Sequence, residues 1–430
     1  MVLIALRLRF GRRNGTVRTH FVLIIDSLLL RIATSVLAVA VPVVALLVGV
    51  SGAAGAPAPR HYGSAAASHD SAAHRRRFGD AKAGEEIFRT TCAACHGLDG
   101  AGAPRSTVGF ALPLPVFNDC FATTAEMTVD WAAVIRDGGP VRGFSRIMPA
   151  FRDLLTPEQI RNVTAYMRTL CKDRRWPVGE FNVALAQTTE KAFPEDELVV
   201  TSALATRAPR SVENHMIWEK RFGIRSQLEL DVPFGFASRP NGASVAGGLG
   251  DVSIAGKHVF VANLNSGTIV SGLAGIVLPT GDRAIGLGTG TTAFEGFILG
   301  AQLLPGRGFF QFQGGLTVPT DQSRAPRSTF FGGALGKTFG LGPITRIWSP
   351  IVELTASHDL VSGARVDWNV VPQFQVSLSA LQHVRLGVGA DIPLTQRDTR
   401  STLARAYLLW DIADGPLLSG WKGWCQGCEH

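Results

Sequence analysis

Regular alternation of apolar and polar residues runs through much of the second half of the chain. Between residues 227 and 236 every second residue is apolar, and the residues between them include Gln227, Glu229 and Asp231. The same alternation returns over residues 310–318, 368–380 and 384–394. A period of two residues is typical of a β-strand with one apolar and one polar face.

The number and length of these runs favour a membrane barrel. Roughly twelve runs of about ten residues lie between residues 196 and 414, separated by Gly, Pro, Asp and Asn turns, and strands that cross a membrane need about nine to eleven residues. We therefore expect an all-β antiparallel outer-membrane barrel of about twelve strands over residues 196–414, with apolar side chains outward and polar ones inward. A periplasmic β-sandwich is the alternative.

Residues 78–177 carry a helical pattern instead. Asp80 is a good N-cap for a first helix, and the pattern predicts a short helix over residues 130–136, before Gly138. Thr156 begins a last helix as its cap, with a proline at the first helical position and Gln159 completing a capping box. Apolar residues then recur at helical spacing, which predicts a multidomain protein with an all-α domain before the barrel.

The N-terminus has the three parts of an export signal. Arginines precede residues 32–50, a run without any charged residue, and a small-residue A-x-A site follows at residues 54–56. We expect residues 1–56 to be a signal peptide and residues 57–77 a linker, and a retained membrane anchor is the alternative. The first 60 residues hold seven arginines and one aspartate, so most of the formal net charge of +8 lies there.

The strongest chemical signal is the pentad at residues 92–96, Cys-Ala-Ala-Cys-His. A C-x-x-C-H sequence predicts attachment of a c-type haem, because Cys92 and Cys95 can form two thioethers while His96 binds the iron. The cofactor predicted is one covalently bound haem c. A zinc half-site or a redox dithiol are the alternatives, and each needs other features around it.

A sixth ligand completes the iron's coordination if the haem is to carry electrons, and a methionine sulfur is suitable. Met148 is the candidate, since Pro149 disfavours helix at the residue before it and keeps that residue in a loop. Met127 and Met167 compete, but the pattern places Met127 at a helix entry and Met167 on an apolar helix face. His96 and Met148 are therefore the predicted ligands of the haem iron.

This region resembles the class I monohaem c-type cytochromes over about 95 residues, from Gly84 through the pentad and the Met148 loop to the last helix. The resemblance implies thioethers at Cys92 and Cys95 and axial ligands at His96 and Met148. Cys120 and Cys171 depart from the pattern of that family. In an exported domain we expect them to form a disulfide, with two buried free cysteines as the alternative.

After a predicted linker over residues 178–195, several phrases in the barrel region resemble the putative outer-membrane transporters of meta-pathway phenol degradation. They are residues 248–252, with Gly-Leu-Gly-Asp-Val, and residues 277–282, with Val-Leu-Pro-Thr-Gly-Asp, followed by Leu287 and Gly288. Simple turn chemistry at strand ends explains the same residues. The four histidines of this region are isolated in the sequence, and no catalytic constellation emerges.

Residues 415–430 form a tail with Cys425 and Cys428. Glu429 stands where a haem-binding histidine is needed, so we expect a local disulfide; a redox dithiol or a metal site are the alternatives.

The combination predicts a haem electron-transfer protein attached to the outer membrane by its own barrel, with the cytochrome domain in the periplasm. The expected partners are periplasmic or extracellular redox proteins and outer-membrane lipid. Nucleic acid is excluded as a partner, because the chain beyond residue 60 is nearly neutral.

The architecture resembles cytochrome-porin fusions that oxidise iron. A transporter for small hydrophobic or aromatic compounds with an accessory redox-sensing cytochrome is the alternative, and a subunit serving a separate dehydrogenase is a third. No second cofactor motif supports calling the chain itself an enzyme.

Overall fold

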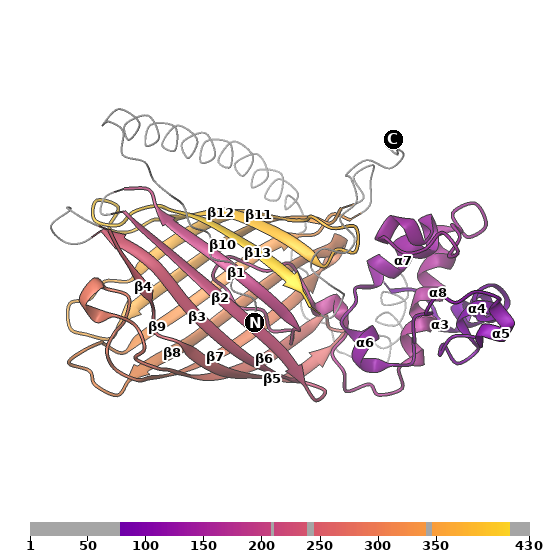
Figure 1. Cartoon of the computed structure of the whole chain (residues 1–430), viewed down its shortest axis with the longest axis horizontal. Helices are drawn as coiled ribbons and strands as arrows, with labels where there is room; N and C mark the ends of the chain where they lie inside the picture. The colour runs from indigo at the N-terminus through magenta and orange to yellow at the C-terminus, as the bar shows by residue number, and fades with distance from the viewer. Residues whose placement is uncertain (1–77, 208–209, 239–244, 341–345, 413–430) are drawn as a thin grey trace, which may run out of the picture. The chain divides into compact units, whose positions relative to one another are not determined.

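The computed structural model describes residues 78–412, apart from residues 208–209, 239–244 and 341–345. The predicted signal peptide 1–56, the linker 57–77 and the tail with Cys425 and Cys428 lie outside the described residues. Helices occupy the N-terminal part and strands the rest, as the sequence pattern predicts (Figure 1). Among the described helices, none is both long and apolar enough to cross a membrane.

The helical domain contains six α-helices and short turns of other helix types in its described residues. Thr156 caps α8 with the predicted capping box: its hydroxyl accepts from the Gln159 N–H while the Gln159 side chain accepts from the Thr156 N–H. Asp80 caps α3 in the same way, by accepting from the first turn. The elements are α3 (Ala81–Ile87), η1 (Phe88–Cys92), α4 (Ala93–His96), α5 (Arg105–Val108), α6 (Cys120–Thr124), α7 (Thr128–Asp137), η2 (Gly139–Arg142) and α8 (Pro157–Leu170).

Close helix packing and a crosslink hold this domain together. Gly84 lets α3 approach α8, since a Cβ at that position would lie 1.8 Å from the carbonyl oxygen of Asn162. Cys120, at the start of α6, and Cys171, just after α8, are joined by a disulfide. The bond ties the long segment before α7 to the end of the last helix.

The strands form one antiparallel sheet that closes on itself. Neighbouring strands pair in chain order, and closure comes from the pairing of β1 with β13, which lie side by side in Figure 1. The bounds are β1 (Glu197–Ala205), β2 (Ser211–Phe222), β3 (Ser226–Ser238), β4 (Val245–Leu249), β5 (Ser253–Asn263), β6 (Thr268–Val277), β7 (Ala293–Leu304), β8 (Gly308–Pro319), β9 (Ser328–Lys337), β10 (Trp348–Asp359), β11 (Asp367–Ser377), β12 (Val384–Pro393) and β13 (Leu403–Asp411).

The 13 strands occupy twelve positions around the barrel. β4 and β5 share one position, because β4 pairs with the end of β3 and β5 pairs with its beginning. Residues 250–252 interrupt this shared position. Apart from the short β4, the strands contain 9 to 13 residues, in agreement with the predicted length.

The outer face is apolar, as the alternation predicts. Gln227 of β3 is completely buried on the inner face whereas its neighbour Leu228 is 42% exposed. Gln311 of β8 is likewise buried between exposed aromatic residues. The sequence pattern predicts polar side chains on the inner face, but part of that face is apolar. The apolar residues there include Leu299, Leu303, Phe309 and Ile351.

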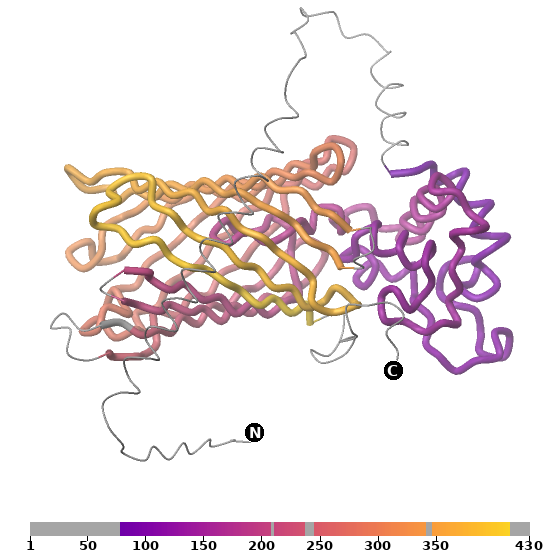
Figure 2. Tube along the Cα trace, turned by 90° about the horizontal axis from the view of Figure 1, so that it is seen from above, coloured from indigo at the N-terminus to yellow at the C-terminus, as the bar shows by residue number. Residues whose placement is uncertain are grey.

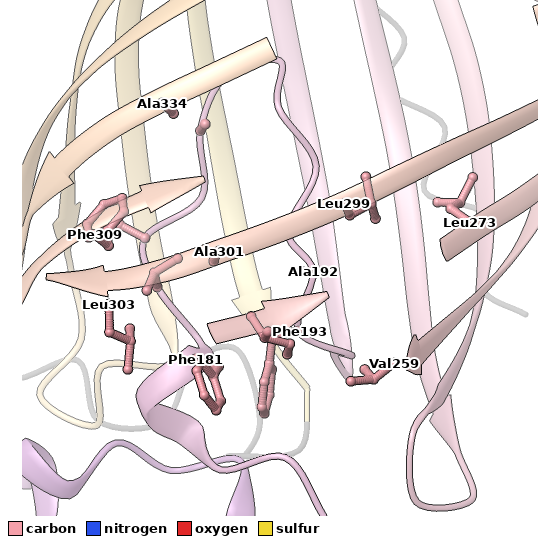
Figure 3. Packing of buried hydrophobic residues seen from close by; sticks show 14 of the residues in the cluster. Phe181, Ala192, Phe193, Val259, Leu273, Leu299, Ala301, Leu303, Phe309 and Ala334 are labelled. Carbon is pink, nitrogen blue, oxygen red and sulfur yellow. The ribbon is translucent and has the colours of Figure 1, made fainter. Parts of the chain in front are cut away.

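The physical reason lies in residues 182–196, which we call the lumen segment. The sequence pattern predicts a linker over residues 178–195, but most of it is buried inside the barrel. Phe193 packs among inward-facing side chains of β5, β7 and β8, together with Phe181 from the short helix η3 (Gly179–Phe181) (Figure 3). The tube in Figure 2 shows the strands surrounding this region. The apolar inner surface is therefore covered by the protein's own chain.

Hydrogen bonds fix the lumen segment to strands around the barrel. Its backbone carbonyls accept from inward-facing side chains of β6, β8 and β13, and its N–H groups donate to inward-facing side chains of β3, β8 and β10. The contacts are Ser271 Oγ to Ala192 O (2.5 Å), Gln311 Nε2 to Ala184 O (2.9 Å), Tyr407 OH to Leu185 O (2.8 Å), Glu195 N to Gln227 Oε1 (2.7 Å), Glu190 N to Gln313 Oε1 (2.8 Å) and Thr189 N to Glu353 Oε1 (2.6 Å).

Candidate functional site

Three consecutive helical turns position the C-x-x-C-H residues. α3 continues into the π-helical turn η1, which ends at Cys92, and α4 carries Cys95 and His96. Gly97 then ends α4 in a conformation with φ of 73°, which favours glycine. Cys92 is half-buried and Cys95 is exposed, so the first thiol faces the domain interior and the second lies near its surface.

The side chain of His96 lies partly buried beside an aromatic ring. Its Nδ1 is buried and has no hydrogen-bond partner, and its ring lies 5.0 Å from the ring of Phe117. Burial lowers the pKa of His96 and so favours the neutral imidazole. A neutral imidazole has the lone pair that a metal ligand needs.

Burial also affects the Cys92 thiol. Burial, followed by the neighbouring Cys95, raises the pKa of Cys92 to about 11. Such a thiol is a poor candidate for a reactive redox dithiol, since reactive cysteines have lowered pKa values. The raised pKa argues against the dithiol alternative.

Met148 lies in a loop that a pair of glycines holds against the domain. Gly139 donates its N–H to the carbonyl oxygen of Met148 over 3.0 Å. Gly138 has a φ of 84°, and a Cβ there would lie 3.1 Å from the same oxygen. The loop therefore has a defined path, with the Met148 side chain packed on the core of the domain.

One apolar cluster connects three of the four predicted haem-binding residues, Cys92, His96 and Met148. Cys92 and Met148 pack against it, and its member Phe117 contacts His96. Met167 is buried within the cluster and Met127 is the N-cap residue of α7, the positions that the sequence pattern predicts for them. The cluster is made of Phe88, Phe117, Ile135, Ile160, Val163, Met167 and Leu170, with Trp131, Phe151, Leu155 and Tyr166 around it.

These residues fit a haem. The porphyrin is a large apolar ring, and the aromatic and aliphatic cluster provides an apolar surface beside the attachment cysteines. The imidazole of His96 and the thioether of Met148 are the donors that such a cofactor requires. Bound there, the haem supplies one-electron redox chemistry, and the protein contributes the two ligands and the exclusion of water.

A comparison with protein families supports the same conclusion. Residues 79–167 match the family model "Cytochrome C oxidase, cbb3-type, subunit III". The helical domain is a cytochrome c domain. A cytochrome domain of this family implies haem, and the chain joins it to a closed barrel. No curated protein matches the chain.

Solved structures with a similar fold cover about half of the chain. The "KdgM porin" is 7% identical with a TM-score of 0.34, over 50% of this chain and 98% of the porin. The "COG4313 outer membrane channel from Pseudomonas putida F1" is 14% identical with a TM-score of 0.37, over 53% of this chain and 98% of the channel. The "NanC porin" is 8% identical with a TM-score of 0.35, over 50% of this chain and 98% of that porin. At this level the likeness says nothing about what this chain binds.

The barrel interior holds a cluster of charged residues that the sequence pattern does not bring together. Carboxylate oxygens of Glu190, Glu219 and Glu229 lie within 4.8 Å of one another, a spacing compatible with a metal ion. The ammonium group of Lys257 is already there, 2.7 Å from Glu190 and 3.7 Å from Glu219. A second lysine, Lys191, lies 2.6 Å from Glu195. The lysines supply the positive charge among these carboxylates.

The histidines of the barrel have ordinary partners. Nδ1 of His215 lies 2.8 Å from Asp231, and Nδ1 of His258 lies 2.8 Å from the Ser226 hydroxyl. His383 is completely buried beside Ser379. The contacts of these three histidines indicate structural roles. His358 lies in β10, and the four histidines come from separate strands or turns.

Proposed function

We propose that the chain is a haem c electron carrier that its own β-barrel holds in the outer membrane. One haem is attached covalently through Cys92 and Cys95, with His96 and Met148 as axial ligands. The observation that carries this proposal is the buried, unpartnered Nδ1 of His96, on the cluster against which Met148 packs. The iron cycles between its ferrous and ferric forms, and this chain makes no bonds to a substrate.

Membrane insertion rests on the outer surface of the barrel. Large apolar side chains point outward from many of the strands, and each is 36–57% exposed. Water-soluble proteins rarely expose so many large apolar side chains around one sheet. These side chains include Trp218, Leu228, Phe236, Phe260, Phe294, Ile298, Phe312, Phe331, Leu354 and Trp368. Lipid is the environment that this surface fits. Export through a signal peptide to the outer membrane, with the cytochrome domain on the periplasmic side, completes the proposal.

The lumen segment favours attachment over transport. An open channel for small hydrophobic compounds needs a free path through the barrel, whereas residues 182–196 fill part of it and are bonded to strands around it. The barrel therefore serves first as an anchor.

Redox titration of the detergent-extracted protein tests the electron-carrier proposal. We expect a reversible one-electron transition with a low-spin spectrum in both states. A haem that stays high-spin, or that cannot be reduced and reoxidised, contradicts the proposal. Liposome swelling with the same preparation tests the transport alternative, which predicts solute entry at a rate that depends on the amount of protein.

A further inference from the structure

A domain fused to a barrel through a linker is commonly free to move. In this chain, described residues of the cytochrome domain form hydrogen bonds with residues of the barrel and of the segment that enters it. We propose that the cytochrome domain is docked rigidly on one end of the barrel, with Glu180 and Arg221 as the residues that position it.

Glu180 and Phe181 are consecutive residues that bind the two domains. The Glu180 carboxylate accepts from the N–H of Thr128 over 3.2 Å and from the Thr128 hydroxyl, and it lies 3.7 Å from the guanidinium of Arg168. Phe181 is 1% exposed and packs with the inner face of the barrel (Figure 3). No flexible residue separates the two attachments.

Close backbone packing also supports the contact between Glu180 and the cytochrome domain. A Cβ at Gly179 would lie 2.1 Å from the carbonyl oxygen of Glu126, so only a glycine lets η3 approach the start of α7 this closely. Arg168 donates to the carbonyl oxygens of Thr123 and Glu126 and stacks 4.0 Å from the Trp131 ring. The carboxylate of Glu180 thus meets an arginine that is itself held in place.

Arg221, at the end of β2, makes the second attachment. Its guanidinium donates to the carbonyl oxygen of Phe121 over 2.7 Å and lies 4.5 Å from the Phe121 ring. Asp196 holds the same guanidinium at 2.9 Å, and both of these charged side chains are 4% exposed. A buried, paired arginine of this kind is fixed in orientation, unlike a surface lysine.

Other turns at the same end of the barrel also contact the domain. Arg225, after β2, donates to the carbonyl oxygen of Arg175 over 2.8 Å. A Cβ at Gly340 would lie 3.7 Å from a methyl group of Val129, and one at Gly143 would lie 3.6 Å from Leu381. The contacts therefore come from the turns that follow β2, β9 and β11. The cytochrome domain is thus held at several places on this end of the barrel and not at a single one.

Rigid docking predicts a high effective concentration for groups that face each other across this junction. The test uses the full chain with Cys425 and Cys428 replaced by serine and with a cysteine pair at Val129→Cys and Gly340→Cys. We expect a disulfide to form readily under mild oxidation, detected as fragments that stay joined after cleavage between the domains until a reductant is added. A control pair, Leu98→Cys with Gly340→Cys, uses a residue that is 60% exposed and should not crosslink.

Loss of the two positioning residues should slow the crosslink. We expect Glu180→Ala with Arg221→Gln to slow it by about tenfold, while the haem spectrum and potential stay unchanged. Glu158→Ala with Arg161→Gln, two exposed positions on α8, is the matched control and should leave the rate unaltered. The proposal is overturned if the test pair and the control pair of cysteines crosslink at equal rates. It is also overturned if Glu180→Ala with Arg221→Gln leaves the rate of the test pair unchanged. The readout needs no electron transfer, so it stands apart from the proposed function.

Discussion

Lys257 of β5 donates a 2.7 Å hydrogen bond to Glu190 of the lumen segment, and the lysine side chain is completely buried. Lys257 Nζ also donates to the carbonyl oxygen of Lys191 over 3.0 Å. A single cation of the barrel wall thus joins both the side chains and the backbone of the segment that fills the barrel.

Removing that cation should loosen the barrel. Lys257→Gln leaves the partly buried Glu190 and the buried Glu219 near each other without the positive charge of Lys257. Breaking a buried ion pair from one side costs about 3–5 kcal/mol. We expect the heat-induced gel-mobility shift of the barrel to occur at a lower temperature. Lys220→Gln is the control, because Lys220 is 51% exposed in its pair with Asp196 and should contribute below about 1 kcal/mol. Equal shifts for both variants would contradict the assigned role of Lys257.

Met148 can be tested against another methionine of the same domain. Met148→Ala should convert the iron to a high-spin state and lower the reduction potential, since a thioether ligand raises it. Met127→Leu changes only the residue before α7 and should keep the low-spin spectrum. Absorption spectra of both oxidation states distinguish the two variants, and an unaltered Met148→Ala spectrum would remove this residue from the ligand set.

The disulfide between Cys120 and Cys171 should stabilise the cytochrome domain. It closes a segment with a sequence separation of 51 residues, for which chain entropy predicts about 3–4 kcal/mol. In urea unfolding followed by haem absorbance, the double variant Cys120→Ser with Cys171→Ser should have a free energy of unfolding lower by that amount. The barrel, followed by its gel mobility, should be unaffected. An unchanged free energy of unfolding would contradict a stabilising role for this disulfide.

Asp251 should hold the loop between β6 and β7. Its carboxylate accepts from the N–H groups of Gly281 and Thr289 and from the Thr289 hydroxyl, at 2.7–2.9 Å. Asp251→Ala removes three hydrogen bonds at once, so we expect faster trypsin cleavage after Arg283. Asp282→Ala removes only the cap of a short helical turn and should change cleavage less. The opposite order of cleavage rates would contradict this role.

The predictable parts of the structure are those that depend on neighbouring residues. The capping box of Thr156 and Gln159 and the alternation along β3 follow from local geometry, and both are confirmed. The lumen segment could not be predicted in this way. Its lysine and glutamates are typical of a solvated linker. Their partners, such as Lys257 and Gln227, lie far along the chain and contact them only after the barrel closes.

The motif around Asp251 shows the same limit. Taken separately, the Gly-Leu-Gly-Asp-Val and Pro-Thr-Gly-Asp sequences predict two turns. The hydrogen bond between Asp251 and Gly281 forms only in the folded barrel. A signal was available in the sequence: Asp251 follows a glycine in the middle of a strand pattern, where an interruption is expected.

The most direct measurement of the central claim is the mass of the tryptic peptide over residues 90–105, taken from protein that has been exported and then extracted with acid and organic solvent. We predict that this peptide carries the added mass of one haem, because two thioethers survive such treatment while a non-covalent cofactor is lost. An unmodified peptide from exported protein would contradict the assignment of Cys92 and Cys95, and with it the electron-carrier function.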